Sequence, residues 1–205
     1  MNDLKTLMSD KKVWYVGFIA MASWSVIGGF AESLGVKFIS SLSNISVPKS
    51  SEIMSMAWIS VAIISPVAGY WSEHVPNKCR PVTIMYSIAL ITFGMIVSGY
   101  VTHPTYIAIL LFIAALSTGG QPIAFGLIAD VAPPHLLATA VSFCNACVIA
   151  GAFILQPLIG FILDFISGGD LSTFSLYNFQ LSFLPISITL LVGIFISLIL
   201  PKAQS

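Results

Sequence analysis

An acidic side chain lies where the sequence is otherwise apolar. Glu32 stands in the stretch GGFAESLGVKF, and Ser25, Gly28 and Gly35 flank it at spacings of three, four and three residues along the chain. On an α-helix these spacings place the four residues on one face. A carboxylate on such a small, polar face can bind a proton or a cation inside a membrane protein. The alternative is an ordinary glutamate at the membrane edge, and Lys37 is expected to extend to that edge.

Amide and indole side chains offer further contacts for a polar solute. Gln121 follows a pair of glycines, while Asn145 and Gln156 are eleven residues apart and so return to one helical face after three turns. The alternatives are amides that join neighbouring helices through hydrogen bonds, and a tryptophan in the core. The residues predicted to bind substrate are Trp24, Ser25, Glu32, Gln121, Asn145 and Gln156.

The patterns of the common hydrolases do not occur in this sequence. The three histidines fall at the ends of apolar segments, and no G-x-S-x-G or H-E-x-x-H pattern is found. Cys79, Cys144 and Cys147 lie in or beside apolar segments and are interpreted as small apolar residues rather than metal ligands. We therefore predict no enzymatic activity, no metal and no cofactor.

Composition identifies the medium in which these residues act. Hydrophobic residues make up 57% of the chain and charged residues 8%, and the mean hydropathy is +0.98. A soluble domain with a hydrated surface does not carry this composition, which indicates a membrane protein. Eight basic and eight acidic residues give no net charge, so nucleic-acid binding is excluded.

Six apolar segments are long enough to cross a bilayer as helices. The predicted fold is therefore an all-α membrane protein with six transmembrane helices, close to residues 13–38, 53–73, 82–101, 105–129, 136–163 and 177–200. The predicted domains are an N-terminal tail over residues 1–12, a six-span domain over 13–201 and a C-terminal tail over 202–205.

The distribution of basic residues predicts the orientation. Lys5, Lys11, Lys12, Lys78, Arg80 and Lys202 fall on one side of a six-span chain, and Lys37 and Lys49 fall on the other. The positive-inside rule then places both termini in the cytoplasm. In a bacterium this would be the inner, plasma membrane.

Paired glycines mark corresponding places in the first and fourth spans. Gly28 and Gly29 follow Trp24 and Ser25, and the fourth span contains the stretch STGGQP, residues 117–122. Interruptions at these two places would suit two repeated three-helix units with a site near the membrane midplane. Close packing of helices is the alternative explanation of paired glycines.

Two stretches resemble the major facilitator superfamily of transporters. The stretch GYWSEHVPNKCR, residues 69–80, is similar to the loop signature of that family. The second stretch, DVAPPHLLATA, residues 130–140, with Asn145, Gly151, Gln156 and Gly160 after it, is similar to the tenth and eleventh helices of such transporters. The resemblance covers nearly the whole chain and implies one half of a bundle of the major facilitator type, the second six helices.

The resemblance implies a conformational role for the loop after the second span. An acid at a helix end and cations in the following turn can form ion pairs that hold two helices in one conformer. The alternative is a set of hydrated charges that determine topology, with an exposed pair worth under about 1 kcal/mol. The residues predicted to form this latch are Gly69, Glu73, Lys78 and Arg80.

The resemblance also implies the function and the partners. We expect a transporter or half-transporter in the lipid bilayer that carries a small polar solute, with proton coupling as an open option, by alternating access with a second six-helix bundle. That bundle would come from a second copy of this chain or from a separate six-span N-terminal half. The alternative is a non-transporting remnant or a six-helix packing partner.

Overall fold

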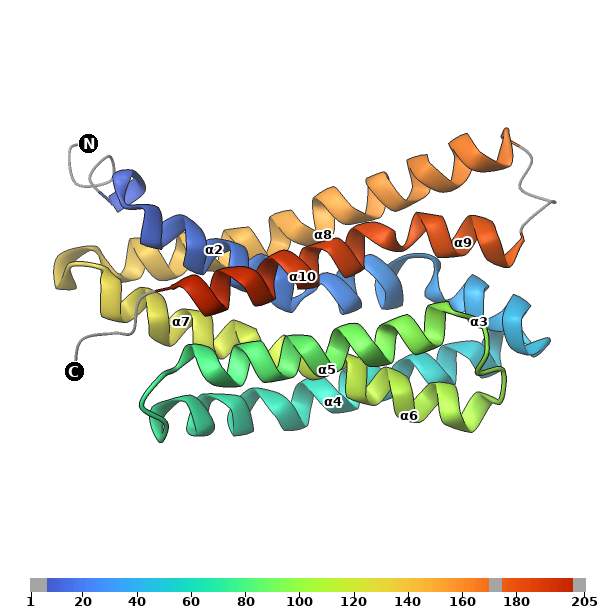
Figure 1. Cartoon of the computed structure of the whole chain (residues 1–205), viewed down its shortest axis with the longest axis horizontal. Coiled ribbons are helices and arrows are strands. Elements are labelled where there is room, and N and C mark those ends of the chain that lie inside the picture. The colour runs from blue at the N-terminus through green and yellow to red at the C-terminus, as the bar shows by residue number, and fades with distance from the viewer. Residues whose placement is uncertain (1–6, 170–174, 201–205) are drawn as a thin grey trace.

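A computed structural model describes residues 7–169 and 175–200, and these form a bundle of helices aligned along one long axis (Figure 1). The predicted tails lie partly or wholly outside this range, since residues 1–6 and 202–205 are not described. Helices long and apolar enough to cross a membrane cover Lys11–Ser43, Val47–Glu73, Cys79–Val97, Pro104–Val131, Pro134–Ser167 and Leu176–Ile199. The prediction of an all-α protein with six spans is confirmed.

The first span consists of three consecutive helical pieces. Helix α2 (Lys11–Ser23) begins at Asp10, whose carboxylate accepts a hydrogen bond from the backbone N–H of Lys12 at 2.8 Å. A π-helical segment, η1 (Ile27–Leu34), follows, and α3 (Gly35–Ser43) ends the span. Ser33 in η1 has backbone angles of φ −116° and ψ −112°, outside the helical region. The first span is therefore interrupted at its paired glycines, one of the two options that the sequence left open.

The fourth span is interrupted at its own pair of glycines. It consists of α6 (Pro104–Ala114), the 3₁₀ segment η2 (Ala115–Gly119) and α7 (Gly120–Val131). The other helices are α4 (Val47–Glu73), α5 (Cys79–Val97), the short 3₁₀ helix η3 (Pro134–Leu136), α8 (Leu137–Ser167), α9 (Leu176–Ser182) and α10 (Leu184–Ile199). The helical geometry of the fourth span therefore changes at its paired glycines as well.

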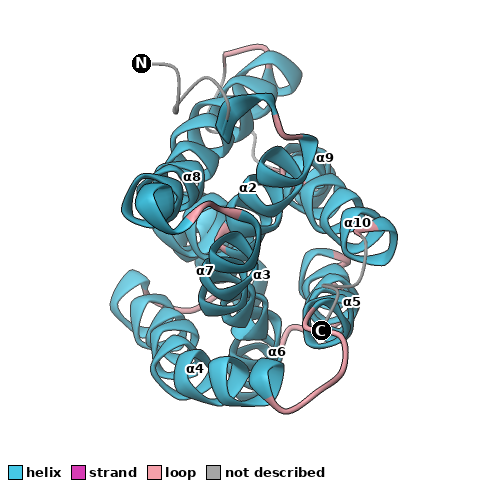
Figure 2. Ribbon diagram, turned by 90° about the vertical axis from the view of Figure 1, so that its left-hand side faces the viewer, coloured by secondary structure: helices cyan, strands magenta, loops and turns pink. Residues whose placement is uncertain are grey.

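Burial separates central from peripheral spans. In the most apolar part of the first span 72% of the residues are buried, and in the fourth 56%, against 33% in the second and 28% in the fifth. Figure 2 shows this order, with α2 and α7 in the middle of the bundle and α4 and α8 at two corners of the same side. The second and fifth spans thus leave wide faces uncovered. We call the side of the bundle between α4 and α8 the open face.

One tyrosine joins four spans in the core. Tyr86 of α5 is fully buried, and its hydroxyl donates a hydrogen bond of 2.5 Å to the carbonyl of Ile19 in α2. Its ring lies against Gly120 of α7 and Gly193 of α10, where any Cβ atom would overlap it. Glycine at these two positions therefore makes room for the tyrosine, as close packing in membranes requires.

An aromatic cluster fills the end of the bundle away from the first residues of α2. Phe30 packs edge-on against Phe38, Phe93 and Phe183, with ring centroids 5.9, 5.4 and 5.0 Å apart. Such geometry is favoured between aromatic rings and adds to the stability from buried apolar area. It anchors η1 and α3 to α5 and to the turn between α9 and α10.

Candidate functional site

Glu32 is exposed at the π-helical interruption of the first span. Within residues 7–169 and 175–200 it makes neither a hydrogen bond nor an ion pair. The stripe expected from α-helical spacing is not continuous, because η1 interrupts it: Ser25, Gly28 and Gly35 are buried. The Ser25 hydroxyl donates to the carbonyl of Ala22, one turn earlier, at 2.8 Å and is not available on the surface.

Gln156 connects α8 to the interruption of the first span. Its amide nitrogen donates a hydrogen bond of 3.1 Å to the backbone carbonyl of Gly28. A Cβ atom at Gly28 would lie 2.7 Å from that of Ala152, so the two helices touch here. Gln156 therefore makes the helix-to-helix bond that the sequence left open as the alternative to a solute contact. Its carbonyl oxygen accepts no hydrogen bond from the described residues.

Trp24 lies at the end of α2 and packs against α4. Its ring is 6.0 Å from that of Trp58, centroid to centroid, at an angle of 68°. Trp24 is partly buried, while Trp58 is 46% exposed. Trp58 was not among the predicted site residues. An isolated tryptophan in an apolar segment carries no signal of its own, and only the packing of the first span against the second brings the two indoles together.

Gln121 and Asn145 lie apart from this pair. Gln121 is partly buried in the first turn of α7, and Asn145 is exposed on α8. Neither side chain makes a hydrogen bond to the described residues. Because α8 is one continuous helix, Asn145 and Gln156 lie on the same side of it, as predicted from their spacing. Whether any of these residues contacts a solute remains a prediction.

The loop after the second span contains an ion-pair cluster. The Nζ atom of Lys78 lies 3.2 Å from Glu73 Oε1 and 2.9 Å from Asp130 Oδ2. Glu73 ends α4, and Asp130 lies in the last turn of α7, so Lys78 joins the ends of the second and fourth spans. The spacing of Glu73 and Lys78 was visible in the sequence. Asp130 was not predicted, because it is 52 residues from Lys78 in the chain and comes close to it only in the folded bundle.

The surroundings of Lys78 favour its charged form. Partial burial lowers the pKa of Lys78, but hydrogen bonds and charge attraction from Asp130 and Glu73 outweigh it and raise the pKa above the ordinary 10.5. The Lys78 side chain is 22% exposed, against 59% for Glu73 and 35% for Asp130. Water therefore screens the Lys78–Asp130 pair less than the Lys78–Glu73 pair, because Asp130 is the less exposed of the two acids.

The two other predicted latch residues lie outside this cluster. Gly69 has open space around its Cα, and Arg80 is exposed in the first turn of α5. Arg80 makes no ion pair within the described part of the chain. A Cβ atom at Gly126 of α7 would lie 3.6 Å from Glu73 Oε1, so α7 faces the Glu73 carboxylate with Gly126.

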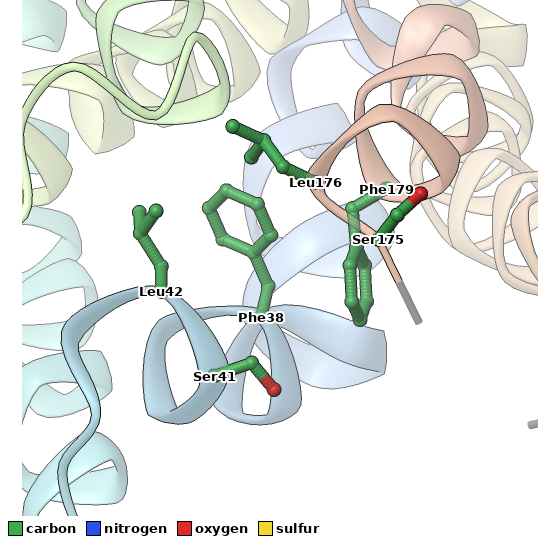
Figure 3. Close-up of a pocket in the computed structure, with 6 residues that line it drawn as sticks. All are labelled: Phe38, Ser41, Leu42, Ser175, Leu176 and Phe179. Carbon is green, nitrogen blue, oxygen red and sulfur yellow. The ribbon is translucent and has the colours of Figure 1, made fainter. Parts of the chain in front are cut away.

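A small hollow lies at the other end of the bundle, between α3 and α9 (Figure 3). Its volume is about 210 Å³, and its walls are Phe38, Ser41, Leu42, Ser175, Leu176 and Phe179. None of the predicted site residues lines it. In the described residues no group of three or more His, Cys, Asp or Glu side chains could hold a metal ion.

Residues 13–205 match one family model, that of the Major Facilitator Superfamily. A bacterial homologue of the human lysosomal transporter Spinster, solved inward-facing and occupied, is similar with a TM-score of 0.73 at 13% identity over 97% of this chain. The inward-open xylose transporter XylE from E. coli has a TM-score of 0.63 at 18% identity over 94%. No individual curated protein matches the sequence.

The match covers these structures only in part. This chain corresponds to 50% of the Spinster homologue and to 47% of XylE. The chain therefore spans about half the length of the transporters whose fold it shares.

Proposed function

Because this chain belongs to the major facilitator superfamily, we propose that it is one half of a membrane transporter that moves a small polar solute by alternating access with a second six-helix bundle. Family and fold support a membrane transporter and point away from an enzyme. The observation that carries the finer proposal is the partial coverage: nearly all of this chain matches half of each solved transporter.

The uncovered faces of two spans support a missing partner. The second and fifth spans are the least buried, and they lie at two corners of one side of the bundle (Figure 2). Asn145 on α8 and Glu32 on the first span are both exposed. A polar group facing hydrocarbon costs a few kcal/mol without a partner or water. A second bundle over the open face would enclose these groups in a shared cavity.

The roles proposed within that cavity follow from the side chains. Glu32 is the candidate proton-linked acid, and Trp24, Gln121, Asn145 and Gln156 are candidate solute contacts. Ser25 could contribute only after a change in η1, because its hydroxyl is bonded within its own helix. Lys78, Glu73 and Asp130 would hold the cytoplasmic ends of two spans together in one conformer, with both termini on the same side of the membrane.

Cross-linking tests the pairing. In a variant without native cysteines, we expect Ile63→Cys on α4 and Asn145→Cys on α8 to form cross-links to a second copy or to a co-expressed six-span protein. Leu191→Cys on α10 is the matched control, because Leu191 and Ile63 are both 52% exposed but α10 lies on the opposite side of the bundle from α4 and α8 (Figure 2). Equal cross-linking at all three positions would indicate random collision.

Proton flux into vesicles that contain a pH-sensitive dye tests the transport activity. Glu32→Gln should change the pH dependence of solute-driven flux more than Asp164→Asn, since Asp164 is exposed near the end of α8. If the chain remains monomeric, forms no cross-link and moves no solute, the remnant or packing partner replaces the transporter.

A further inference from the structure

The hollow between α3 and α9 combines an apolar interior with hydroxyl groups at its opening (Figure 3). Phe38 and Phe179 are almost fully buried, at 1% and 2% exposed, whereas Ser41 and Ser175 are exposed. Two leucines complete the walls, and none of the six lining side chains is charged. A molecule in the hollow would therefore meet aromatic and aliphatic carbon inside and hydroxyl groups outside.

The aromatic side chains at the base of the hollow are held in place. Phe38 packs edge-on against Phe179 and Phe183, with ring centroids 5.4 and 5.6 Å apart. Phe179 also stacks on Phe183 at 6.1 Å and an angle of 21°. Each of the two lining rings thus has at least two aromatic partners, and such contacts stabilise their orientation. Neither ring can turn into the hollow and fill it without losing these contacts.

The wall formed by α9 is fixed to the end of α5. Gly99 has a φ of +77° and lies directly against the Leu176 side chain, where any Cβ atom would overlap it. The Gln180 amide donates hydrogen bonds of 3.3 and 3.1 Å to the carbonyls of Val97 and Ser98. The hollow is therefore already formed without a ligand, as binding sites for small molecules usually are.

The two hydroxyl groups retain hydrogen-bonding capacity. Ser175 begins α9, and its Oγ accepts a hydrogen bond of 3.3 Å from the backbone N–H of Asn178. Its own O–H group donates to no acceptor in the described residues, and Ser41 makes no hydrogen bond to them. A serine hydroxyl both donates and accepts, so each could bond to a hydroxyl group of a ligand.

Volume and lining define the class of molecule that fits. An apolar protein cavity of about 150 Å³ holds benzene, so the volume of about 210 Å³ here suits one six-membered ring with a small substituent. An ion would leave water for a hollow whose walls carry no opposite charge, which is costly. The walls thus favour a neutral molecule.

We propose that this hollow binds a small neutral amphiphile of the phenol class, with its ring against Phe38 and Phe179 and its hydroxyl group bonded to Ser175. None of the residues predicted to contact a solute lines the hollow. The site is therefore separate from the open face, and the proposal does not depend on the transporter function.

Fluorine NMR tests the ligand class with probes of similar size. 4-Fluorophenol, fluorobenzene and 4-fluorobenzoate would each be titrated into the whole purified chain in a neutral sugar detergent, with protein-free micelles as the blank. We expect saturable broadening of the 4-fluorophenol signal beyond the blank. Fluorobenzene should bind about three- to tenfold more weakly, because it lacks the hydroxyl group. The benzoate should bind more weakly still, because its charge has no partner in the walls.

Substitutions locate the binding. Leu42→Trp should fill the hollow and remove the saturable signal, and Ser41→Leu should weaken binding several-fold by narrowing the opening. Leu191→Trp is the matched control, because it adds the same side chain at an exposed position of α10, away from the lining residues. It should bind 4-fluorophenol like the unaltered chain. Circular dichroism and gel filtration check that each variant is folded.

Three results would each overturn the proposal. The first is no saturable binding beyond the micelle blank. The second is undiminished binding by folded Leu42→Trp and Ser41→Leu. The third is a different preference, either equal binding of 4-fluorobenzoate or tighter binding of n-hexanol, which would show a hollow for anions or for unbranched chains. Transport plays no part in these measurements, so a chain that moves no solute could still bind the phenol.

Discussion

The two glycine pairs of the molecule have opposite local structures. At Gly28–Gly29 the first span widens into a π-helix, while at Gly119–Gly120 the fourth span tightens into a 3₁₀ segment. The second pair is enclosed, with Met85 and Ala68 against Gly119 and Tyr86 against Gly120. The first pair also has close neighbours, but it lies near an exposed acid in the chain, Glu32, and the Gly28 carbonyl accepts a hydrogen bond from Gln156.

The difference shows that paired glycines in a span have no single meaning. In the fourth span they are sites of close helix packing, the explanation that the sequence left as an alternative to a functional interruption. In the first span close packing and an altered backbone occur together. A π-helical turn leaves backbone groups out of the regular α-helical pattern, and such turns are frequent at functional sites. The first span is therefore the better candidate for movement.

The largest expected effect is at the enclosed pair. Gly120→Ala places a methyl group in the position of the Tyr86 hydroxyl, and overpacking of this kind costs about 1–3 kcal/mol. We expect a clear fall in the midpoint of thermal unfolding in detergent. Gly69→Ala, where no atom lies within 4 Å, is the control and should leave the midpoint unchanged or slightly raised. Equal stability of the two variants would contradict the packing described around Tyr86.

Gly28→Ala is expected to lower the stability less than Gly120→Ala does, and a second substitution should compensate for the loss. The added methyl would meet the Cβ of Ala152 at 2.7 Å, and Ala152→Gly removes that atom. The double variant should therefore recover most of the stability that Gly28→Ala loses, which a double-mutant cycle measures. Failure to recover would place the strain at the neighbours that remain, the Ala152 backbone and the Trp24 ring, or in the π-helix itself.

A smaller effect is expected from the bond that joins α8 to the first span. Gln156→Leu keeps the size of the side chain but leaves the Gly28 carbonyl without its donor, at a cost of about 0.5–2 kcal/mol. Asn145→Leu on the same side of α8 removes no bond to the described residues and should be neutral in stability. Hydrogen exchange at residues 27–34 should rise in the first variant and not in the second.

The smallest effect is expected at the ion pairs of Lys78, where the second and fourth spans end. Lys78→Met should cost under about 1 kcal/mol, and Asp130→Asn more than Glu73→Gln, because Asp130 is the less exposed partner. The pKa of Lys78 is raised in the folded protein, so its contribution is fully present at neutral pH and is lost as the pH rises through that raised pKa. A stability difference between Lys78→Met and the unaltered chain that grows above pH 10.5 would contradict this sign.

Much of the fold was predictable because long apolar runs in a bilayer allow few alternatives. The six spans follow from run length, and the paired glycines marked the two places where a span could be interrupted. Whether each helix would widen or tighten at its glycines was not predictable. The same residue pair gives a wide turn where it packs against α8 and α10 and a tight turn where it packs against α4 and α5. That choice depends on which neighbours approach.

The site was less predictable, because it also depends on which spans are neighbours. Glu32 stood out because a charge in an apolar run is rare. Trp58 and Asp130 gave no such signal, because Trp58 meets Trp24 and Asp130 meets Lys78 only across spans. Conversely, Ser25 matched a polar stripe on paper but is turned into its own helix. Periodicity predicts faces of a regular helix and fails where the helix changes its pitch.

Tyr86 has a consequence for the order in which the chain can mature. Its hydroxyl needs Ile19 from the first span, and its ring needs the space provided by glycines of the fourth and sixth spans. A nascent chain that has inserted only its first five spans still lacks the Gly193 side of this enclosure. Until the sixth span has inserted, one side of the Tyr86 ring therefore has no neighbour from α10, and this part of the core is incomplete.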